Sequence, residues 1–392
     1  MDFEERLALA PMMEVTDVYY RRLLRIMTSK TVLYTEMVVD DTINHTPNID
    51  FVIGKHPGVF PSVIQLGGSN PETLGQAAGV CGRYDSGYAE LNLNCGCPSN
   101  RVAKRCFGAQ LMLKPDLVRE IVHTMRRTSN LPVSVKCRLG VKGERDSYED
   151  LVEFISAANA GGATKFIVHS RDCVLAGLTT KQNRDIPPLR YEVVHRLVND
   201  FPDLTFILNG GVATLQAAKD HFAVGSFTSK DTTGVDGEDG RTSKEKLLPP
   251  VHGVMIGRAV ASEPVLFATA DSEIYGCPDP CKSRRVLLDT YCDYADWVQS
   301  GEGPRRTTND GKVQRVSTAL LINAMRNVMC GLPNNRKYLR ALNDIYVEEI
   351  NSGTANSEYP LASDIIQRAI SCISDEALDS PLRPTGMGKT MV

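Results

Sequence analysis

The sequence predicts an α/β fold, an eight-stranded TIM (β/α)8 barrel followed by a C-terminal all-helical domain, and two observations carry this prediction. Apolar strand-like runs alternate with helical patterns over about 260 residues, which is the size of a closed eight-stranded barrel. Beyond residue 284 the helical periods continue without further strand signals. A doubly wound open sheet is the rival fold, but the G-x-G-x-x-G turn that follows its first strand is absent.

The expected strands are short and end in polar or glycine residues. They are Leu7–Pro11, Val32–Met37, Ser62–Gly68, Tyr88–Asn94, Val133–Arg138, Phe166–Arg171, Thr205–Gly211 and Val254–Arg258. The helical patterns between them cover Asp17–Met27, Pro71–Gly82, Lys114–Thr128, Ser147–Ala160, Leu189–Asn199 and Thr214–His221. Pro71 after Asn70, together with Asp116 and Glu149 early in their helices, is typical of helix starts.

The overall composition is that of an ordinary soluble protein. The chain has 392 residues, 42% of them apolar and 23% charged, with a net charge of −3, so any basic surface must be local. No apolar run reaches the ~20 residues that a membrane span needs. Eleven cysteines without a regular framework, and no signal-peptide pattern, predict a reducing compartment. We therefore expect a cytoplasmic monomer, with an organellar location left open if an upstream leader is missing.

The polar residues of the predicted strands gather at their carboxyl ends. They are Gln65, Asn92, Asn94, Lys136, Arg138, His169, Arg171, Asn209 and Arg258. Because those ends meet at one mouth of a barrel, their common placement predicts a shared site there. Taken singly, Lys136 could be a salt-bridged rim residue and His169 a satisfied core histidine.

A cysteine pair follows the fourth predicted strand. Cys95 and Cys97 are spaced C-x-C, and no second Cys/His cluster lies at zinc spacing, so we expect no metal site. A buried pair that packs as small hydrophobes is the alternative to a functional cysteine. Further along the chain, Asn209-Gly-Gly and Ile256-Gly-Arg258 close strands seven and eight, where such barrels frequently bind a phosphate. This pair of motifs predicts a flavin-phosphate site.

The domain organisation is predicted from changes in composition. We expect a barrel over 1–277, in which the polar, glycine-rich stretch 225–250 is a disordered insertion, then a helical domain over 281–376 and a flexible tail over 377–392. The helical periods cover Arg284–Gln299, Val313–Cys330, Arg336–Asn351 and Ala362–Ser374. Between residues 281 and 345 there are eleven Lys and Arg but only six Asp and Glu. This local excess of positive charge is suited to binding a polyanion. The alternative is a helix face that is simply solvated.

The motifs together resemble those of the tRNA-dihydrouridine synthases, in the bacterial-type branch that acts on D-loop uridines 20 and 20a. The resemblance covers about residues 7–275 and continues weakly through Gly331–Arg336. The motifs that carry it are Ala10-Pro-Met-Met, Tyr34-Thr-Glu-Met, Gln65-Leu-Gly-Gly, Glu90-Leu-Asn-Leu-Asn-Cys-Gly-Cys-Pro-Ser, Phe107-Gly-Ala-Gln-Leu-Met, Val135-Lys-Cys-Arg-Leu-Gly, Val168-His-Ser-Arg, Asn183-Arg-Asp-Ile-Pro-Pro-Leu, Asn209-Gly-Gly-Val and Val254-Met-Ile-Gly-Arg. The resemblance implies a barrel that binds FMN, NADPH as reductant, and a helical domain that binds tRNA.

The resemblance also implies roles for single residues. The catalytic cysteine would be Cys97, with Cys95 as a packing residue, and Asn94 would contact the target base. Lys181 and Arg184 match positions that contact tRNA. The implied flavin contacts are Pro11, Met12, Gln65, Lys136, His169, Asn209, Gly210, Gly211, Gly257 and Arg258. We add the hypothesis that Arg171, with Lys136, offsets negative charge that develops on the substrate.

The implied reaction reduces the 5,6-double bond of a uracil that has been swung out of the tRNA. A hydride passes from the flavin N5 to C6, and Cys97 gives a proton to C5. Two alternatives stay open: another FMN-dependent barrel oxidoreductase that acts on a small pyrimidine or enoate, and a non-catalytic RNA-binding protein. The chain also departs from the branch, since Leu320 and Asn323 stand where arginines that orient tRNA are expected. The modified position is therefore an expectation only.

Overall fold

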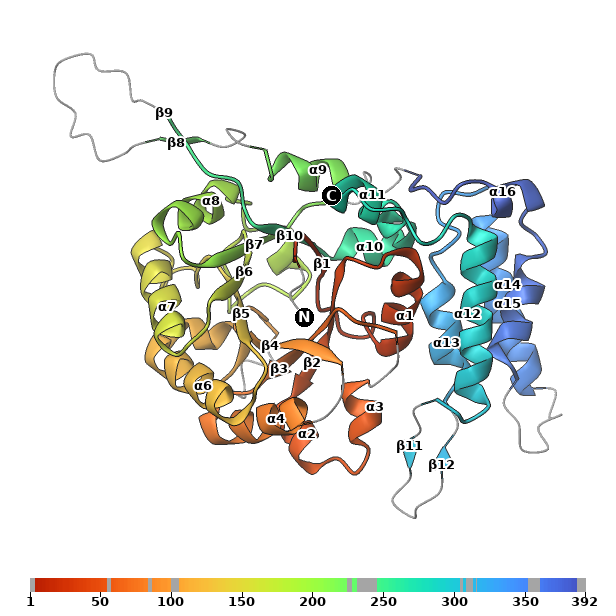
Figure 1. Cartoon of the computed structure of the whole chain (residues 1–392), viewed down its shortest axis with the longest axis horizontal. Coiled ribbons are helices and arrows are strands. Elements are labelled where there is room, and N and C mark those ends of the chain that lie inside the picture. The colour runs from red at the N-terminus through yellow and green to blue at the C-terminus, as the bar shows by residue number, and fades with distance from the viewer. Residues whose placement is uncertain are drawn as a thin grey trace.

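A computed structural model shows a closed barrel surrounded by helices, with further C-terminal helices beside it (Figure 1). The structure describes residues 4–54, 58–83, 87–99, 106–223, 228–230, 245–303, 306–307, 313–314, 316–351 and 360–385. The barrel strands are β1 (Leu7–Leu9), β2 (Val32–Val39), β3 (Ser62–Gly67), β4 (Tyr88–Asn94), β5 (Val133–Arg138), β6 (Lys165–His169), β7 (Thr205–Asn209) and β10 (Gly253–Ile256). Their order around the barrel is β1-β10-β7-β6-β5-β4-β3-β2, and the recorded pairings are parallel. The predicted TIM (β/α)8 barrel is confirmed.

The outer helices follow the predicted positions to within a few residues. They are α1 (Val18–Met27), α4 (Pro71–Arg83), α6 (Pro115–Thr128), α7 (Tyr148–Ala160), α8 (Tyr191–Asp200) and α9 (Leu215–Asp220); α10 (Arg258–Ser262), after the eighth strand, was not predicted. Side-chain caps fix several starts: Asp17 accepts from the backbone N–H of Tyr20, and Ser147 with Asp150 forms a capping box on α7. The sequence did not predict the short helices α2 (Asp40–His45), α3 (Ile49–Ile53) and α11 (Ala270–Tyr275), or the 3-10 turns η1 (Gly108–Leu113), η2 (Gln182–Arg184) and η3 (Pro264–Phe267).

The barrel interior is apolar on one side and polar on the other. Ala8, Val32, Val63, Ile207 and Met255 belong to one buried cluster inside the barrel. Across from them, β4 and β5 turn polar side chains inward at every second position, as the period of a strand requires. Those residues are Glu90, Asn92, Asn94, Ser134, Lys136 and Arg138.

A buried charge cluster stabilises the amino-terminal floor of the barrel. Lys165 Nζ lies 2.5 Å from Glu5 Oε2 and 2.6 Å from Glu90 Oε2, and the Tyr34 hydroxyl donates to Glu5 at 2.8 Å. Burial raises the pKa of Glu90 to about 7, against the opposing effect of Lys165. Burial works to lower the pKa of Lys165, but Glu5 and Glu90 together raise it. Lys165 is therefore held in its charged form by the two carboxyl groups, and it opposes the effect of burial on Glu90.

The C-terminal region is a set of helices that packs against α1 (Figure 1). It contains α12 (Arg284–Gln299), α13 (Thr318–Met325), α14 (Asn335–Asn351), α15 (Ala362–Ile370) and α16 (Asp375–Asp379). The expectation of no strands here was wrong, because β11 (Arg306–Thr307) and β12 (Val313–Gln314) pair in an antiparallel hairpin. For the same reason α13 begins at Thr318 and not at Val313. Within the described residues, the structure has no helix with the length and apolar character that crossing a membrane demands.

Two segments expected to lack structure differ in part from that prediction. Most of the insertion at 225–250, residues 231–244, lies outside the described residues; at its edges β8 (Thr228–Lys230) pairs with β9 (Glu245–Leu247). The tail predicted to be flexible from residue 377 has defined contacts within its described part, residues 377–385. Leu382 is buried and its N–H donates to Lys282 O at 2.8 Å, and the Thr385 hydroxyl bonds to Glu263 at 2.7 Å. The contacts with the linker and the barrel explain why this segment does not fray.

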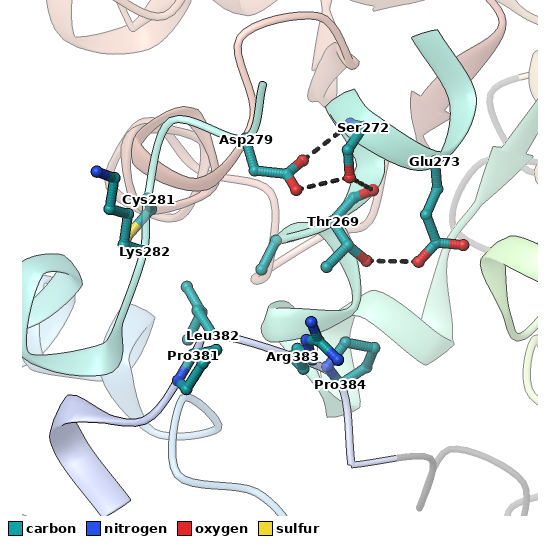
Figure 2. A pocket seen from close by; sticks show the side chains of 11 residues that line it. Thr269, Ser272, Glu273, Asp279, Cys281, Lys282, Pro381, Leu382, Arg383 and Pro384 are labelled. Atoms are coloured by element: carbon teal, nitrogen blue, oxygen red, sulfur yellow. Dashed lines mark hydrogen bonds between the residues drawn. The ribbon is translucent and has the colours of Figure 1, made fainter. Parts of the chain in front are cut away.

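This ordered C-terminal segment forms one wall of a pocket of about 680 Å³ (Figure 2). The opposite wall is α11 and its flanks, where Ser272 bonds to Asp279 and Thr269 bonds to Glu273. None of the predicted site residues lines this pocket. It belongs to the junction between the barrel and the C-terminal helices.

We expect Lys165→Met to lower the free energy of unfolding by about 3 to 5 kcal/mol at pH 8, because it leaves two buried carboxylates without a counter-charge. The loss should shrink toward pH 5, where protonation of Glu90, whose pKa is raised to about 7, removes part of the uncompensated charge. Urea denaturation at several pH values measures this. Lys219→Met, which removes a half-exposed ion pair with Glu273, should cost less than about 1 kcal/mol. A Lys165 variant as mild as this control would contradict the assignment.

Candidate active site

The register of the barrel brings the predicted polar residues to one end. Asn94 pairs with Lys136, and Arg138 pairs with His169. His169 in turn lies beside Asn209, which pairs with Met255 of β10. These neighbours all stand at or near the carboxyl ends of their strands, so the side chains surround a single mouth.

The cysteine loop after β4 is held by the last residue of the strand. Asn94 Oδ1 accepts from the backbone N–H groups of Gly96 at 3.2 Å and Cys97 at 3.0 Å. The Asn94 amide then donates to Gln65 Oε1 at 2.8 Å, and Gln65 donates to Asn92 Oδ1 at 2.8 Å. With one amide N–H already committed, Asn94 has a single N–H left for a substrate.

The two cysteines of this loop have different surroundings. Cys95 is fully buried, its backbone N–H donates to Lys136 O at 2.8 Å, and burial holds the pKa of its thiol well above the usual range. Cys97 is partly exposed, and its carbonyl accepts from the backbone N–H of Ala109 at 3.0 Å. Of the two cysteines, Cys97 therefore has exposed surface, whereas Cys95 is packed in the buried core.

Several positively charged side chains lie around the mouth of the barrel. Burial, followed by the charges of Arg138, Lys136, Arg171 and Arg258, holds the pKa of His169 well below its ordinary value. Burial and the neighbouring Arg138 lower the pKa of Lys136 to about 8, while its ammonium group donates to Asn209 Oδ1 at 3.0 Å. The ring atom Nδ1 of His169 is buried and has no hydrogen-bond partner among the described residues. A positive potential with an unused ring nitrogen is the expected environment for an anionic ligand.

The glycine turn after β7 has the backbone geometry of a close approach. Gly210 and Gly211 have φ values of 112° and 70°, which residues with side chains rarely adopt. A Cβ at Gly210 would lie 3.4 Å from His169 Nε2. Asn209 is fixed through its amide, which donates to Met255 O at 2.9 Å. The turn thus stands directly beside the cationic mouth.

The loops after β1 and β10 lie next to each other. Ala10 N–H donates to Ile256 O at 2.8 Å, and a Cβ at Gly257 would lie 3.2 Å from Ala10 Cβ and 3.6 Å from Met12 Sδ. Pro11 and Met12 are partly buried in this contact. Arg258, by contrast, is exposed and pairs with Asp185 at 2.6 Å. The structure therefore brings Pro11, Met12 and Gly257 together at the same mouth as Lys136 and His169.

A long loop after β6 covers one side of the mouth and is tied down by buried arginines. Arg138 donates from Nε to Gly96 O at 3.0 Å and from one terminal nitrogen to Asp172 O at 3.0 Å and Asn183 O at 2.9 Å. Arg171 donates to the carbonyls of Asp185, at 3.2 Å, and Pro187. Arg171, predicted to face the substrate, therefore uses one end of its guanidinium to hold this loop.

Lys181 and Arg184, the predicted tRNA contacts, lie in this loop at or beside η2. Lys181 is exposed and Arg184 is partly buried. Cys97 is within electrostatic range of Arg184, Arg138 and Lys136. The sequence predicted that Arg138 belongs to the shared site but gave it no individual role, and it gave none to Asn183 or Asp185. The Lys-x-Arg spacing of β5 places Arg138 on the same inward face as Lys136.

The residues present fit a flavin that carries a phosphate. The glycine turn leaves room for a close ligand, the unpartnered His169 Nδ1 offers a polar contact, and the surrounding cations suit the negative charge of a phosphate or of a reduced ring. Lys136, His169 and the turn at Asn209, Gly210 and Gly211 would hold it. Among the described residues, the carboxylate that pairs with a site arginine is that of Asp185, with Arg258, whereas Arg138 bonds to the backbone carbonyl of Asp172.

Fold and site together define a (β/α)8-barrel enzyme with a cysteine at a cationic mouth. Comparison with known proteins narrows this class. A sequence model described as dihydrouridine synthase matches residues 8–228. A tRNA-dihydrouridine(20/20a) synthase of Synechocystis sp. is 36% identical over 338 residues, which cover 86% of this chain and 88% of the relative. A protein of the same name from Vibrio vulnificus is 39% identical over 292 residues, covering 74% and 80%.

The chain belongs to the dihydrouridine synthase family. The same name is carried by a protein of Shewanella oneidensis, 33% identical over 344 residues, with 88% of this chain and 89% of the relative covered. Members of this family are flavin-dependent oxidoreductases. The expected family membership is confirmed, and the matched region spans the cysteine loop, the cationic mouth and the glycine turn.

We expect flavin-free Lys136→Met to be more stable than the wild type at pH 7, by up to ~3 kcal/mol. The folded protein holds the pKa of Lys136 at about 8, below the ~10.4 of a free lysine, so protonating it opposes folding at all pH values below 8. This penalty fades as pH rises from 8 toward 10.5, and the two proteins should then converge. Thermal unfolding against pH measures the effect, with Lys30→Met at an exposed position as the control. A variant that is less stable than wild type at pH 7 would disprove it.

Proposed function

We propose that this protein is a tRNA-dihydrouridine synthase that reduces the 5,6-double bond of a D-loop uridine, at position 20 or 20a. The observation that carries the proposal is the partly exposed Cys97 at a cationic barrel mouth. Cys97 lies within the residues matched by the family model, and the names of the relatives support the choice of substrate. The direct experiment is to incubate the purified protein with NADPH and unmodified tRNA and to measure dihydrouridine by mass spectrometry.

The cofactor in this proposal is FMN, and NADPH is the reductant. When bound, the flavin supplies the hydride for C6 of the uracil. Pro11, Met12 and Gln65 would face its ring system, and Lys136 and His169 would contact its polar edge. Gly210, Gly211, Gly257 and Arg258 would surround its phosphate. Arg258 must then exchange or share its partner Asp185, since the two are paired at 2.6 Å.

Cys97 holds the proton that C5 receives. Its backbone is fixed by Asn94 Oδ1 at 3.0 Å and by Ala109, so the thiol is presented at a set place above the mouth. Lys136, Arg138 and Arg184 lie within electrostatic range and would favour negative charge on the uracil carbonyl. The remaining amide N–H of Asn94 would contact the base. Arg171 would contribute through its charge, because part of its guanidinium holds the Pro187 loop.

The C-terminal helices would bind the tRNA backbone. Exposed cations that could contact phosphates are Arg326, Arg336, Lys337 and Arg340. Two other cations of this region are committed elsewhere. Arg284 is buried and donates to Val328 O at 3.2 Å, and Arg285 pairs with Asp375 at 2.6 Å and Asp379 at 2.5 Å. The basic surface is therefore smaller than the sequence count of eleven Lys and Arg indicates.

The choice of uridine rests on the relatives' names and has one feature against it. Leu320 and Asn323, which replace expected arginines, are exposed on α13. Mapping dihydrouridine in tRNA from cells that lack this protein identifies the position. A purified enzyme that reduced a free pyrimidine or enoate without RNA would instead be a small-substrate oxidoreductase. The cytoplasmic location and the monomeric state stay predictions.

We expect Cys97→Ala to keep its flavin and its affinity for tRNA but to form dihydrouridine about 100-fold to 10,000-fold more slowly, since the proton donor is missing. Flavin absorbance, a tRNA gel shift and mass spectrometry of digested tRNA measure the three properties. Cys95→Ala is the matched control, because its thiol is fully buried two residues away. Undiminished product formation by Cys97→Ala would remove this residue from the mechanism.

A double variant, Lys181→Ala with Arg184→Ala, should raise the KM for tRNA by about tenfold at ~0.1 M salt without loss of flavin. Each lost phosphate contact should also lower the steepness of the salt dependence by about one. The control is Arg126→Ala with Arg127→Ala, two exposed cations in the last turn of α6, which runs back to the opposite rim of the barrel. Equal KM values for the two double variants would disprove the assignment.

A further inference from the structure

The glycine turn beside the mouth is held from behind by a tyrosine on α8. The Tyr191 hydroxyl donates to Gly210 O at 2.8 Å. It also stands where a side chain of Gly211 would lie, since a Cβ there would be 2.6 Å from this oxygen. Tyr191 and the turn therefore interlock, and the glycine at 211 is required both by its φ of 70° and by the hydroxyl.

This hydrogen bond sets the direction of a backbone donor. In a trans peptide the carbonyl of one residue and the N–H of the next point in opposite directions. With Gly210 C=O drawn to Tyr191, the N–H of Gly211 faces the other way. Among the described residues this N–H has no recorded acceptor, and Gly211 is exposed. His169 Nε2 borders the turn, 3.4 Å from where a Cβ of Gly210 would be. The turn thus offers a fixed donor beside a cationic group.

Tyr191 is itself backed by two histidines. Its ring packs edge-on against His221, with ring centroids 4.7 Å apart. His221 Nδ1 lies 3.1 Å from His195 Nε2, and His195 Nδ1 lies 2.7 Å from Pro249 O. Because a carbonyl can only accept, His195 Nδ1 carries the proton. Neutral His195 then accepts at Nε2, so His221 donates from Nδ1. The pair has one defined arrangement of protons.

The same histidines close the base of the insertion. His221 ends α9 just before it, and its carbonyl accepts from Val251 N–H at 3.2 Å on the far side. Burial and the neighbouring His195 lower the pKa of His221 to about 4, and burial lowers that of His195, so both are neutral near pH 7. The support behind Tyr191 is consequently a neutral, hydrogen-bonded histidine pair that is anchored on Pro249 O and packs against the ring of the tyrosine.

We infer that Tyr191, supported by the His221–His195 pair, is a positioning residue that orients the Gly210–Gly211 turn toward a phosphate and so makes the site select a phosphorylated flavin. This inference rests on the proposed function only in taking a flavin as the ligand. The hydroxyl of Tyr191 touches the turn and not the cofactor. Its loss should therefore weaken recognition of the phosphate and leave recognition of the ring system unchanged.

The test compares two flavins that differ only in the phosphate. Flavin-free protein is titrated with FMN and with riboflavin, and binding is followed by flavin fluorescence. We expect Tyr191→Phe to bind FMN about three- to tenfold more weakly, as for one lost hydrogen bond, and riboflavin within twofold of the wild type. Tyr148→Phe is the matched control, because its hydroxyl bonds to Asp200 at 2.8 Å on the outer surface. It should leave both affinities unchanged.

The histidine support is tested with a conservative and a disruptive change. His221→Asn keeps an amide N–H near the position of Nδ1 and should retain most of the preference for FMN over riboflavin. His221→Leu leaves His195 Nε2 without a donor and should reduce this preference by about two- to fivefold. Melting temperatures measured alongside show whether each variant is folded.

The outcomes distinguish a failure of the positioning role of Tyr191 from a failure of the proposed function. Unchanged FMN affinity in Tyr191→Phe, or equal loss for FMN and riboflavin, would overturn the positioning role while leaving the proposed function intact. A wild-type protein that binds neither flavin would overturn both. A selective loss for FMN in Tyr191→Phe, with Tyr148→Phe unaffected, is the expected result.

Discussion

The structure depends on a chain of hydrogen bonds that runs through the barrel from its mouth to its floor. Asn94 bonds to Gln65, Gln65 to Asn92, Asn92 to Ser134 and Ser134 to Glu90, which is paired with Lys165. Buried polar groups are costly unless each has a partner, so this chain permits one register of β3, β4, β5 and β6. Because Asn94 also accepts from Cys97, the position of the cysteine loop is fixed by the same network that closes the barrel.

The mouth above this network is built from groups that repel one another. Lys136, Arg138, His169, Arg171 and Arg258 lie at this mouth, and burial, together with the neighbouring positive charges, lowers the pKa values of Lys136 and His169. Such strain is tolerated because the floor and the outer helices supply stability elsewhere. An anion relieves the repulsion when it binds. The arrangement of cations at the mouth is thus more stable with an anionic ligand bound than without one.

Much of the barrel could be predicted because its signals are local. Apolar alternation located the strands, and the polar residues at their ends located the mouth. The sequence could not show which residues far apart in the chain become partners in the folded protein. Glu90 and Lys165 are separated by 75 positions yet form one floor cluster, and each by itself is only a charge in a strand. Arg285 is neutralised by Asp375, which lies 90 residues away, so its charge was overcounted as surface.

The short elements and loop contacts were missed for a different reason. The β11–β12 hairpin and α2 are short elements without clear periodicity, and neither gives a signal above that of a loop. The roles of Asn183 and Tyr191 depend on loops that fold over strand ends, so their neighbours in space are not their neighbours in sequence. The tail was expected to fray because of its glycines and prolines, but Leu382 and Thr385 find partners on the linker and the barrel.

Those partners have a mechanical consequence. Thr385 bonds to Glu263 at 2.7 Å, and Asn327 of the C-terminal region donates to Ala261 O at 2.7 Å. Both anchors lie in or directly after α10, the helix that begins at Arg258. The C-terminal helices are therefore mounted on the short stretch that follows the eighth strand, and not only on their covalent linker. Together with the packing of α12 and α13 on α1, these contacts tie the C-terminal helices to the barrel beside Arg258, so a shift of the helices would be felt at the edge of the mouth.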